Sequence, residues 1–371
     1  MKRTYDAVVL GAGIIGAACA LECAKAGMRT AIVERDRVAS GATGAAMGHV
    51  VVMDDSPAQF ALTKYSQTLW NELAGELPAS AEYYQPGTIW VAADEEEMAE
   101  LRRKLAFFSA HGVPAELLDS QSLSDAEPNL LQALSGGLRV SSDAVLYPPA
   151  ATAFLLEQAQ QQPARLELFE NHPVMQASHG TVVLQDGDSF HSSIIINATG
   201  VYAPALTPGI AIRKRKGHLM ITESCPRFAR HQLVELGYLK SAHSSTADSV
   251  AFNVQPRMNG QLLIGSSRQY DEEDSAVEPR MIEWIKERAS LFMPGVTSLP
   301  IARSWTGFRA ATPDKLPLIG PTEDSSIFLA TGHEGLGITT SLATARLLLN
   351  HIMGNASAIP IDPYLPSRMA R

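Results

Sequence analysis

Tyr5-Asp-Ala-Val-Val-Leu-Gly11-Ala-Gly13-Ile-Ile-Gly16-Ala-Ala-Cys-Ala20 is the segment around which this chain is organised. A short β-branched run passes into Gly-x-Gly-x-x-Gly and then into an Ala-rich segment, which predicts a strand, a tight turn and a helix. Gly11 makes the turn, Gly13 lets a pyrophosphate approach the backbone, and Gly16 lets helix and strand pack closely. The start of such a helix offers unpaired N–H groups and a positive dipole end to phosphates. The segment therefore predicts a dinucleotide site.

A second predicted strand, residues 29–33, ends at Glu34, 23 residues after Gly11. An acidic residue at this distance accepts hydrogen bonds from the hydroxyls of a ribose. Glu34 would also repel a 2′-phosphate, although Arg35 beside it keeps the phosphorylated cofactor from being excluded. The following loop is rich in small residues, and its hydroxyls at Ser40 and Thr43 are candidate donors to phosphate.

Composition limits the class of protein. The chain has 371 residues, of which 46% are hydrophobic and 19% charged, so it is long enough for two domains and too apolar to be disordered. A net charge of −9 argues against a nucleic-acid partner. The three cysteines, Cys19, Cys23 and Cys225, form no Cys-x-x-Cys motif, which favours reduced thiols over disulfides or a metal site. Asp6 interrupts a signal-like N-terminus and no run reaches 18 apolar residues, so we expect a cytoplasmic protein without a transmembrane helix.

The remaining pattern alternates between helical and extended segments, with the nucleotide-type segments scattered along the chain, so the domains must interleave. Residues 112–150 are predicted to be rich in loops. We expect helices at 58–77, 95–111, 150–162, 279–292 and 338–353, and strands at 87–93, near Leu166, Val174 and Val182, at 193–197, within 211–270 and at 327–331.

Four motifs in this order resemble the D-amino-acid oxidase and glycine oxidase superfamily of flavoproteins. They are the N-terminal glycine motif with Glu34, Asn197-Ala-Thr-Gly200, Lys216-Gly217, and Gly307-Phe-Arg309 with Thr312-Pro-Asp314, Pro317-Leu-Ile-Gly320 and Thr331-Gly-His333…Gly337. The resemblance implies FAD and an α/β fold, with a Rossmann-like FAD-binding domain interleaved with a β-sheet-based α+β substrate domain. We expect the FAD-binding domain to comprise 1–80, 145–208 and 318–371, and the substrate-binding domain 81–144 and 209–317.

Within the superfamily, the chain most resembles the flavin β-subunits of hydrogen cyanide synthase and of D-hydroxyproline and opine dehydrogenases. The run 332–341 and Lys216-Gly-His-Leu219 favour the hydroxyproline branch. This implies partner subunits that carry electrons onward and could hold the enzyme at the inner membrane. Two departures matter: Glu334-Gly335 replaces an aromatic–arginine pair of related oxidases, and Leu263 replaces a lysine that promotes reaction with oxygen. The first removes a second carboxylate anchor and argues against a simple glycine oxidase, and the second favours a dehydrogenase. The absence of a cysteine linked to flavin implies dissociable FAD.

Oxidation of an amino acid at Cα requires a group that binds its carboxylate, and the resemblance gives this role to Arg309. A guanidinium fits because its fork makes two parallel charge-assisted hydrogen bonds; the alternative is a surface arginine paired with a carboxylate. His49 and His333 are grouped with it as flavin or substrate neighbours, without an assigned proton transfer. Lys216 lies either near the flavin or in a basic surface run, and Glu334 could select a cationic or hydroxylated substrate.

The resemblance, together with the glycine motif, gives the residues expected to hold FAD. The helix expected from Ile338 would place its positive end near the flavin, where reduced flavin carries negative charge. The full set is Gly11, Gly13, Ile15, Gly16, Glu34, Arg35, Ser40, Thr43, Gly48, His49, Val174, Thr199, Gly200, Gly332, Gly335, Leu336, Gly337, Ile338 and Thr339.

The predicted function is thus an FAD-dependent dehydrogenase that oxidises the Cα–N bond of a D-configured or cyclic secondary amino acid, with D-hydroxyproline the leading substrate. Three alternatives remain open. The first is a glycine or D-amino-acid oxidase that uses oxygen, the second a flavin-bearing relay or assembly subunit without its own substrate, and the third a nicotinamide-dependent dehydrogenase. The last is disfavoured because the C-terminal turn and helix would then have no purpose.

Overall fold

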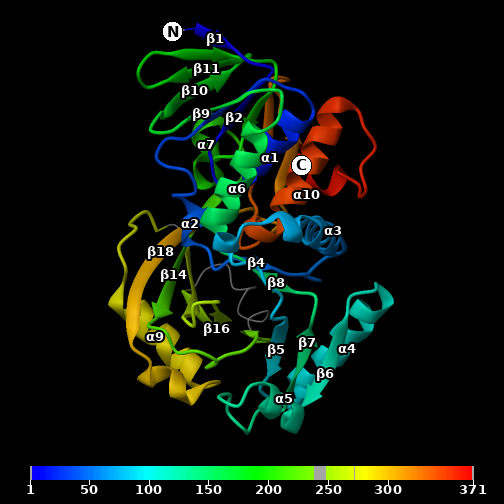
Figure 1. Ribbon diagram of the computed structural model, residues 1–371, viewed down its shortest axis with the longest axis vertical. Helices are drawn as coiled ribbons and strands as arrows, with labels where there is room; N and C mark the ends of the chain where they lie inside the picture. Colours follow the sequence, from blue (N-terminus) through cyan, green and yellow to red (C-terminus); the bar gives the residue numbers. More distant parts are fainter. Residues whose placement is uncertain (1, 238–247, 271, 370–371) are drawn as a thin grey trace. The chain divides into compact units, whose positions relative to one another are not determined.

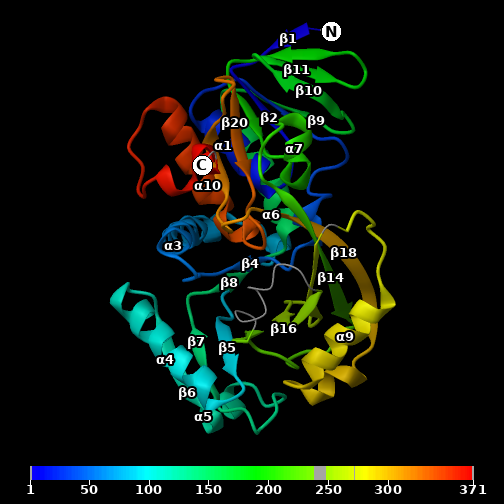
Figure 2. The same ribbon diagram turned by 180° about the vertical axis from the view of Figure 1, so that it is seen from behind.

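The computed structural model describes residues 2–237, 248–270 and 272–369, which form two compact units (Figures 1 and 2). Unit 1 comprises Met1–Ala81, Leu146–Lys214 and Phe308–Arg371, and unit 2 comprises Glu82–Val145 and Arg215–Gly307. Two of the borders fall inside long strands, β14 (Arg213–Thr222) and β18 (Ile301–Ala311). The corresponding domain limits predicted from the sequence lie in flanking segments, at 208/209 and 317/318.

Unit 1 is built on a six-stranded sheet of order β19-β20-β13-β2-β3-β9. All neighbouring pairs are parallel except β19–β20. The parallel strands are short and mostly apolar, as expected for a sheet covered on both faces. The six strands of this sheet are β2 Ala7–Leu10, β3 Thr30–Val33, β9 Leu166–Phe169, β13 Ile195–Asn197, β19 Leu318–Pro321 and β20 Ile327–Thr331.

A second sheet of unit 1 has the order β1-β12-β11-β10 and packs on the first. Side chains such as Val8, Val33 and Ile195 from the large sheet meet Val182 and Phe190 from the small one in a single apolar cluster. Strand β12, which has only three residues, is not predicted from the sequence. The strands are β1 Lys2–Thr4, β10 Val174–Ser178, β11 Thr181–Leu184 and β12 Ser189–His191.

Helices α1, α6 and α10 pack together in unit 1, and α10 also packs against α3 (Figure 1). Helix α10 ends at Gly354, whose left-handed φ of 69° suits a glycine C-cap. Its buried face is wide, because Thr344 and Leu347 are buried as well as Ile338 and Ala345. The bounds are α1 Ile14–Lys25, α2 Ala42–Ala45, α3 Pro57–Leu73, α6 Pro148–Gln160, α7 Ala203–Leu206 and α10 Gly337–Met353, with the two-residue strand β4 at His49–Val50.

Unit 2 contains most of an eight-stranded sheet of order β18-β14-β17-β16-β15-β5-β7-β6. The β15–β5 pair is parallel, and the other pairs with a described register are antiparallel. Part of the predicted β-rich stretch, residues 238–247, lies outside the described residues. The remaining elements are β5 Thr88–Ala92, β6 Ala115–Asp119, β7 Gly136–Val140, β8 Ala144–Val145, β15 Gln232–Glu235, β16 Ser249–Pro256, β17 Leu262–Tyr270, α4 Glu95–Ala110, α5 Ser120–Ala126 and α9 Pro279–Ser290.

The core of unit 2 lies on one face of this sheet. There Phe252, Val254 and Ile264 pack against Ile282 and Ile285 of α9. The prediction that residues 112–150 are rich in loops is wrong, because β6, α5 and β7 occupy much of this segment. No helix in the described part of the chain is both long and apolar enough to cross a membrane.

Candidate functional site

The glycine turn after β2 has two glycines that the fold itself requires. Gly11 has a φ of 95°, and a Cβ there would lie 2.8 Å from the Ala198 carbonyl oxygen. A Cβ on Gly16 would overlap the Gly11 carbonyl oxygen. Gly13 differs, since its Cβ would meet only the Thr43 Oγ1 atom, at 3.0 Å, within the described residues. The space above Gly13 is what a pyrophosphate needs in order to approach the backbone.

Glu34 is buried beside this turn and is held by backbone donors. Its Oε2 accepts from the Ala12 N–H at 2.8 Å and its Oε1 accepts from the Asp36 N–H at 3.0 Å. A carboxylate has about four lone-pair positions, so two hydrogen bonds leave acceptor capacity for a ligand. The side chain is thus fixed in place while it can still receive the hydroxyls of a ribose.

The start of α1 is suited to an anion. Its N-cap is Gly13, its first turn contains no acidic residue, and the Ile14 N–H donates to the Thr43 Oγ1 at 3.0 Å. The Thr43 hydroxyl therefore has its own hydrogen left to donate. Ser40 is exposed in the loop before α2, and Ile15 is partly exposed on the first turn of α1.

The end of β13 lies beside Gly11 and is shaped by Asn197. The Asn197 Oδ1 accepts from the Thr199 N–H at 3.2 Å and from the Thr199 hydroxyl at 2.7 Å, while the Gly200 carbonyl accepts from Thr331 at 3.0 Å. This network joins the ends of β13 and β20, two neighbouring parallel strands. The carboxyl ends of such strands are where ligands bind in open α/β sheets.

Arg35 follows the end of β3 at this strand edge, whereas Val174 lies in β10 of the smaller sheet. The Arg35 guanidinium lies 4.3 Å from the centre of the Tyr202 ring and forms an ion pair of 2.9 Å with Asp36. Tyr202 is an aromatic neighbour that the sequence analysis missed, since no motif marks it. Val174 is in β10 opposite Leu184, where it packs against the core between the two sheets of unit 1.

Gly48 precedes β4, and His49 is the first residue of this strand. Gly48 has a φ of 108°, and a Cβ there would overlap the Leu146 carbonyl oxygen, so packing alone explains this glycine. The His49 carbonyl accepts from the Thr339 hydroxyl at 2.8 Å, which ties it to the first turn of α10. Its Nε2 is buried and has no hydrogen-bond partner within the described residues. Burial lowers the pKa of His49 to about 4, so the imidazole is neutral near pH 7.

The C-terminal turn precedes α10. Gly332 has a φ of 80°, and a Cβ there would lie 2.6 Å from the Thr312 Cγ2. A Cβ on Gly335 would meet no atom within 4 Å in the described part of the chain, and one on Gly337 would make only an ordinary contact at 3.6 Å. Leu336 is the N-cap of α10 and provides no side-chain cap, and the first turn has no acidic residue. The N-terminal end of α10 therefore also offers N–H groups to an anionic or electron-rich ligand.

Ile338 is buried in this first turn, where its carbonyl accepts from the Trp70 indole at 3.2 Å. His333 is buried, and its Nε2 lies 2.9 Å from the Thr344 hydroxyl of α10. Burial lowers the pKa of His333 to about 3, so this histidine is neutral as well. Its contacts make it a link between the turn and the helix.

Arg309 lies within β18, near the end of the strand. The end of this strand is joined to the C-terminal turn: the Glu334 N–H donates to the Ala310 carbonyl at 2.9 Å, and Ala311 forms a β-bridge with His333. The Glu334 Oε2 accepts from the N–H of Gly335 at 2.9 Å. The fold thereby brings the strand that carries Arg309 to the start of α10.

A family model described as FAD dependent oxidoreductase, DAO, matches residues 6–350. The chain belongs to this family. A glycine oxidase of Geobacillus kaustophilus (strain HTA426) is 27% identical over 383 residues, which cover 99% of this chain and 98% of the relative. The solved structure of glycine oxidase from Geobacillus kaustophilus matches with a TM-score of 0.88 and 26% identity, covering 99% of both chains. These findings confirm the predicted fold class, the oxidoreductase activity and FAD as the cofactor.

Two other relatives also match along nearly their whole length. Hydrogen cyanide synthase subunit HcnC of Pseudomonas aeruginosa is 26% identical over 427 residues, covering 99% of this chain and 97% of the relative. A D-amino acid dehydrogenase of Cereibacter sphaeroides (strain ATCC 17029 / ATH 2.4.9) is 24% identical over 433 residues, covering 98% and 97%.

The residues of unit 1 fit the cofactor of this FAD-dependent family. Two helix starts free of acidic residues, the open space at Gly13 and Gly335, and the remaining acceptor capacity of Glu34 match a dinucleotide with a flat ring system. The buried Nε2 of His49 is a further polar atom that a ligand could satisfy.

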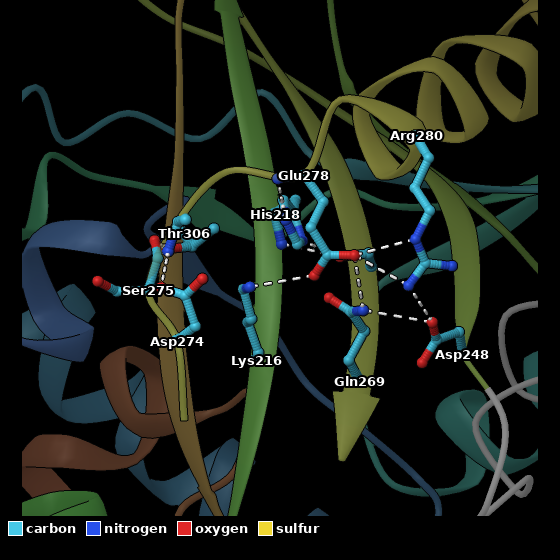
Figure 3. A network of polar contacts seen from close by, with 11 residues as sticks. Lys216, His218, Asp248, Gln269, Asp274, Ser275, Glu278, Arg280 and Thr306 are labelled. Atoms are coloured by element: carbon cyan, nitrogen blue, oxygen red, sulfur yellow. Dashed lines mark hydrogen bonds and ion pairs between the residues drawn. The ribbon is translucent and has the colours of Figure 1, made fainter. Parts of the chain in front are cut away.

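Lys216 and Leu263 lie in unit 2. Lys216 is buried in β14 with its Nζ 3.1 Å from the Glu278 Oε1, and Arg215 beside it is buried too (Figure 3). The alternative that Lys216 belongs to a basic surface run is therefore wrong, because both residues are buried although they lie on opposite faces of the strand. Leu263 is buried in β17 between Ile221 of β14 and Gln255 of β16.

Proposed function

We propose that this oxidoreductase is a dehydrogenase of D-configured or cyclic secondary amino acids, with D-hydroxyproline the leading substrate. The observation that carries the proposal is the hydrogen bond from Glu334 to Ala310, with the adjoining bridge between Ala311 and His333. These contacts hold the strand of Arg309 against the turn that opens α10. These two elements must lie side by side if Arg309 is to bind the carboxylate of an amino acid next to a flavin ring at the start of α10.

Arg309 is proposed to bind the substrate carboxylate. A guanidinium stays charged at any working pH and presents two parallel N–H groups to a carboxylate, which fixes both position and orientation. Because β18 is a strand of the sheet and not a loop, the side chain starts from a rigid backbone. Orientation of the substrate Cα is the main contribution that the protein can make here.

The cofactor-binding residues named in the sequence analysis are proposed to hold FAD in unit 1. FAD, when bound, supplies the acceptor for the hydride that leaves Cα. The start of α1 and Thr43 would receive the pyrophosphate, and Glu34 the ribose hydroxyls. The start of α10, beside the open space at Gly335, would stabilise negative charge on the flavin ring.

Neither histidine of unit 1 is proposed as a base. His49 and His333 have lowered pKa values because burial disfavours their charged forms. A base with so low a pKa is a poor acceptor for a proton from the substrate. The substrate amine is therefore expected to arrive neutral. His49 is proposed to use its buried Nε2 as a hydrogen-bonding group toward FAD.

A dehydrogenase must pass its electrons to an acceptor other than oxygen, and partner subunits are proposed for this role. Support comes from Leu263, an apolar residue where some related oxidases have an oxygen-activating lysine, and from the similarity to HcnC, which is named as a subunit. The D-amino acid dehydrogenase relative supports the same class of reaction.

Anaerobic spectroscopy tests this function. Purified holoenzyme is mixed without oxygen with D-amino acids, D- and L-hydroxyprolines, glycine and opines, and loss of the flavin absorbance is followed. We expect the fastest loss with D-hydroxyproline, and much faster turnover with a dye than with oxygen. Similar rates of peroxide formation and dye reduction would favour the oxygen-using alternative, which the glycine oxidase relative supports. No reduction by any of these compounds would favour the relay subunit.

A further inference from the structure

The two faces of the sheet in unit 2 differ in chemistry. On the face covered by α9, Lys216 of β14 and Gln269 of β17 are directly opposite each other, and both bind Glu278 just before the helix (Figure 3). The Lys216 Nζ donates to the Glu278 Oε1 at 3.1 Å, and the Gln269 Nε2 donates to the Oε2 at 3.4 Å. Arg280 at the start of α9 binds the same carboxylate and Asp248. These residues fix two neighbouring strands to the start of the helix.

His218 adds a neutral member to this network. Its Nε2 accepts from the Glu278 N–H at 3.1 Å, so its proton is on Nδ1, which lies 2.9 Å from the Ser267 hydroxyl. His218 and Ser267 are fully buried, and burial lowers the pKa of His218 to about 4. The ion pairs and hydrogen bonds of this network on the α9 side are thus made between residues of unit 2.

The residues next to this network lie on the other face, because side chains alternate along a strand. Arg215 is opposite Tyr270, and its guanidinium lies 5.8 Å from the centre of that ring. Arg268, two residues before Tyr270, shares this face and is a diagonal neighbour of Arg215, a separation of about 7–8 Å between Cα atoms. Arg215 is only 3% exposed and Arg268 only 5%.

Asn253 of β16 also lies on this face, which we call the distal face. Its neighbours in sequence, Phe252 and Val254, pack with α9 in the apolar core, so Asn253 points the other way. Asn253 is 8% exposed, and its Oδ1 has no hydrogen-bond partner among the described residues. Two buried guanidiniums and a buried amide make this part of the distal face polar and positively charged.

We propose that Arg268, with Arg215 beside it, forms a carboxylate-binding subsite on the distal face. This inference rests on the proposed function, in which the substrates are amino acids. A guanidinium has five N–H donors, so each arginine can bind a carboxylate while it keeps other neighbours. Two cations close together in a buried position favour an anion strongly. The network on the α9 face holds the strands that present them, as a supporting layer should for a binding site.

The carboxylate could be the α-carboxylate of the substrate or a second acidic group that it carries. The two sources are distinguished with unreactive probes on the holoenzyme: pyrrole-2-carboxylate, pyrrole-2,5-dicarboxylate and the uncharged pyrrole-2-carboxamide. Binding is measured by calorimetry, so no turnover is needed. Failure of the proposed function, with no amino acid oxidised, is thereby kept apart from failure of this subsite.

The test compares Arg268→Met with Arg102→Met, a matched control at an exposed position on α4, outside this network. Loss of Arg268 is expected to weaken carboxylate binding about 30-fold or more, since the anion loses its buried partner. The control should change it less than about twofold. Arg268→Lys should fall between, because it keeps the charge but not the fork, and it replaces the Met variant if that variant fails to fold.

Equal weakening of both acids by Arg268→Met assigns the subsite to the α-carboxylate. Loss of only the additional affinity of the dicarboxylate assigns it to a second acidic group. The proposal is overturned if Arg268→Met and Arg268→Lys bind both acids as the parent does, or if the carboxamide is weakened as much as the carboxylate.

Discussion

The two glycine turns of unit 1 precede α1 and α10, the helix starts proposed to face FAD, yet their glycines are there for different reasons. In the N-terminal turn, Gly11 and Gly16 are required by the protein backbone, because a Cβ on either would collide with a carbonyl oxygen. In the C-terminal turn only Gly332 is confined in this way, by Thr312. Gly335 has open space around it, so the fold of unit 1 does not explain its identity.

This difference separates residues that build the site from residues that leave room in it. A substitution at a confined glycine should unfold the turn with or without cofactor. A substitution at Gly335 should leave the fold intact and disturb only a bound group. The comparison therefore predicts how stability and cofactor affinity respond to each change.

The largest effect is expected from Gly16→Ala. The added methyl group overlaps the Gly11 carbonyl oxygen, so strand and helix must separate, at a cost of about 3 kcal/mol or more in the free energy of unfolding. Urea unfolding of the apoprotein measures this loss. Gly75→Ala, where a Cβ would meet no atom within 4 Å in the described residues, serves as the control and should change stability by less than about 0.5 kcal/mol. Equal stability of the two variants would remove the distinction between confined and open glycines.

Glu34→Ala should have the next largest effect, mainly on the cofactor. The change removes the proposed ribose acceptor and the two hydrogen bonds to Ala12 and Asp36, and should weaken FAD binding by about 1–3 kcal/mol. Equilibrium dialysis of the apoprotein with FAD provides the measurement. Glu34→Gln keeps one acceptor oxygen and should lose less affinity. Parental FAD affinity in the Ala variant would place the ribose elsewhere.

Gly335→Ala should have a smaller effect of about 1 kcal/mol on FAD affinity and none on the stability of the apoprotein. The methyl group has space in the protein but would press on a flavin ring at this turn. The two quantities are measured on the same preparation, by urea unfolding without FAD and by dialysis with it. A loss of stability without a loss of affinity would reverse the assignment and make Gly335 a structural glycine.

The smallest effect is expected on the rate of flavin reduction when pH is varied, because His49 and His333 should not contribute to its pH dependence. Their folded pKa values, about 4 and about 3, lie below the ordinary value of 6.5, so the unfolded chain binds protons first as pH falls. Their contribution to stability is complete above pH 6.5 and decreases from there toward pH 4 and 3. Melting temperature should fall in that window, while the rate of flavin reduction shows no histidine inflection between pH 6 and 8. An inflection that His49→Gln or His333→Gln removes would contradict the neutral assignment.

Much of unit 1 could be predicted because its signals are local. The strand, glycine turn and helix at residues 7–25 follow from residue types at fixed spacing, and the structure has β2 and α1 there. The same holds for β20 and α10. The packing role of Gly48 could not be predicted from local sequence, because the residue it packs against, Leu146, is distant in sequence.

Residues 112–150 show why the rest was harder. Gly136 and Gly137 suggest a loop, but they lie in β7, where a Cβ on Gly137 would be 2.9 Å from Ile89 of β5 and one on Gly136 would overlap the Leu118 carbonyl oxygen. These glycines permit close approach between strands, which a sequence pattern cannot distinguish from a turn. The burial of Lys216 likewise depends on a partner, Glu278, that only the fold brings near.

The central claim is that Arg309 binds the substrate carboxylate, and stopped-flow reduction of the bound flavin without oxygen tests it most directly. With the best substrate of the amino-acid panel, Arg309→Met should lower the second-order rate constant of flavin reduction by about 30- to 4,000-fold, which corresponds to about 2–5 kcal/mol. FAD content and melting temperature should stay near the parental values, and Arg309→Lys should recover only part of the rate, because an ammonium lacks the planar fork. Parental reduction kinetics in an Arg309→Met enzyme that binds FAD normally would contradict the account and place the carboxylate on another cation.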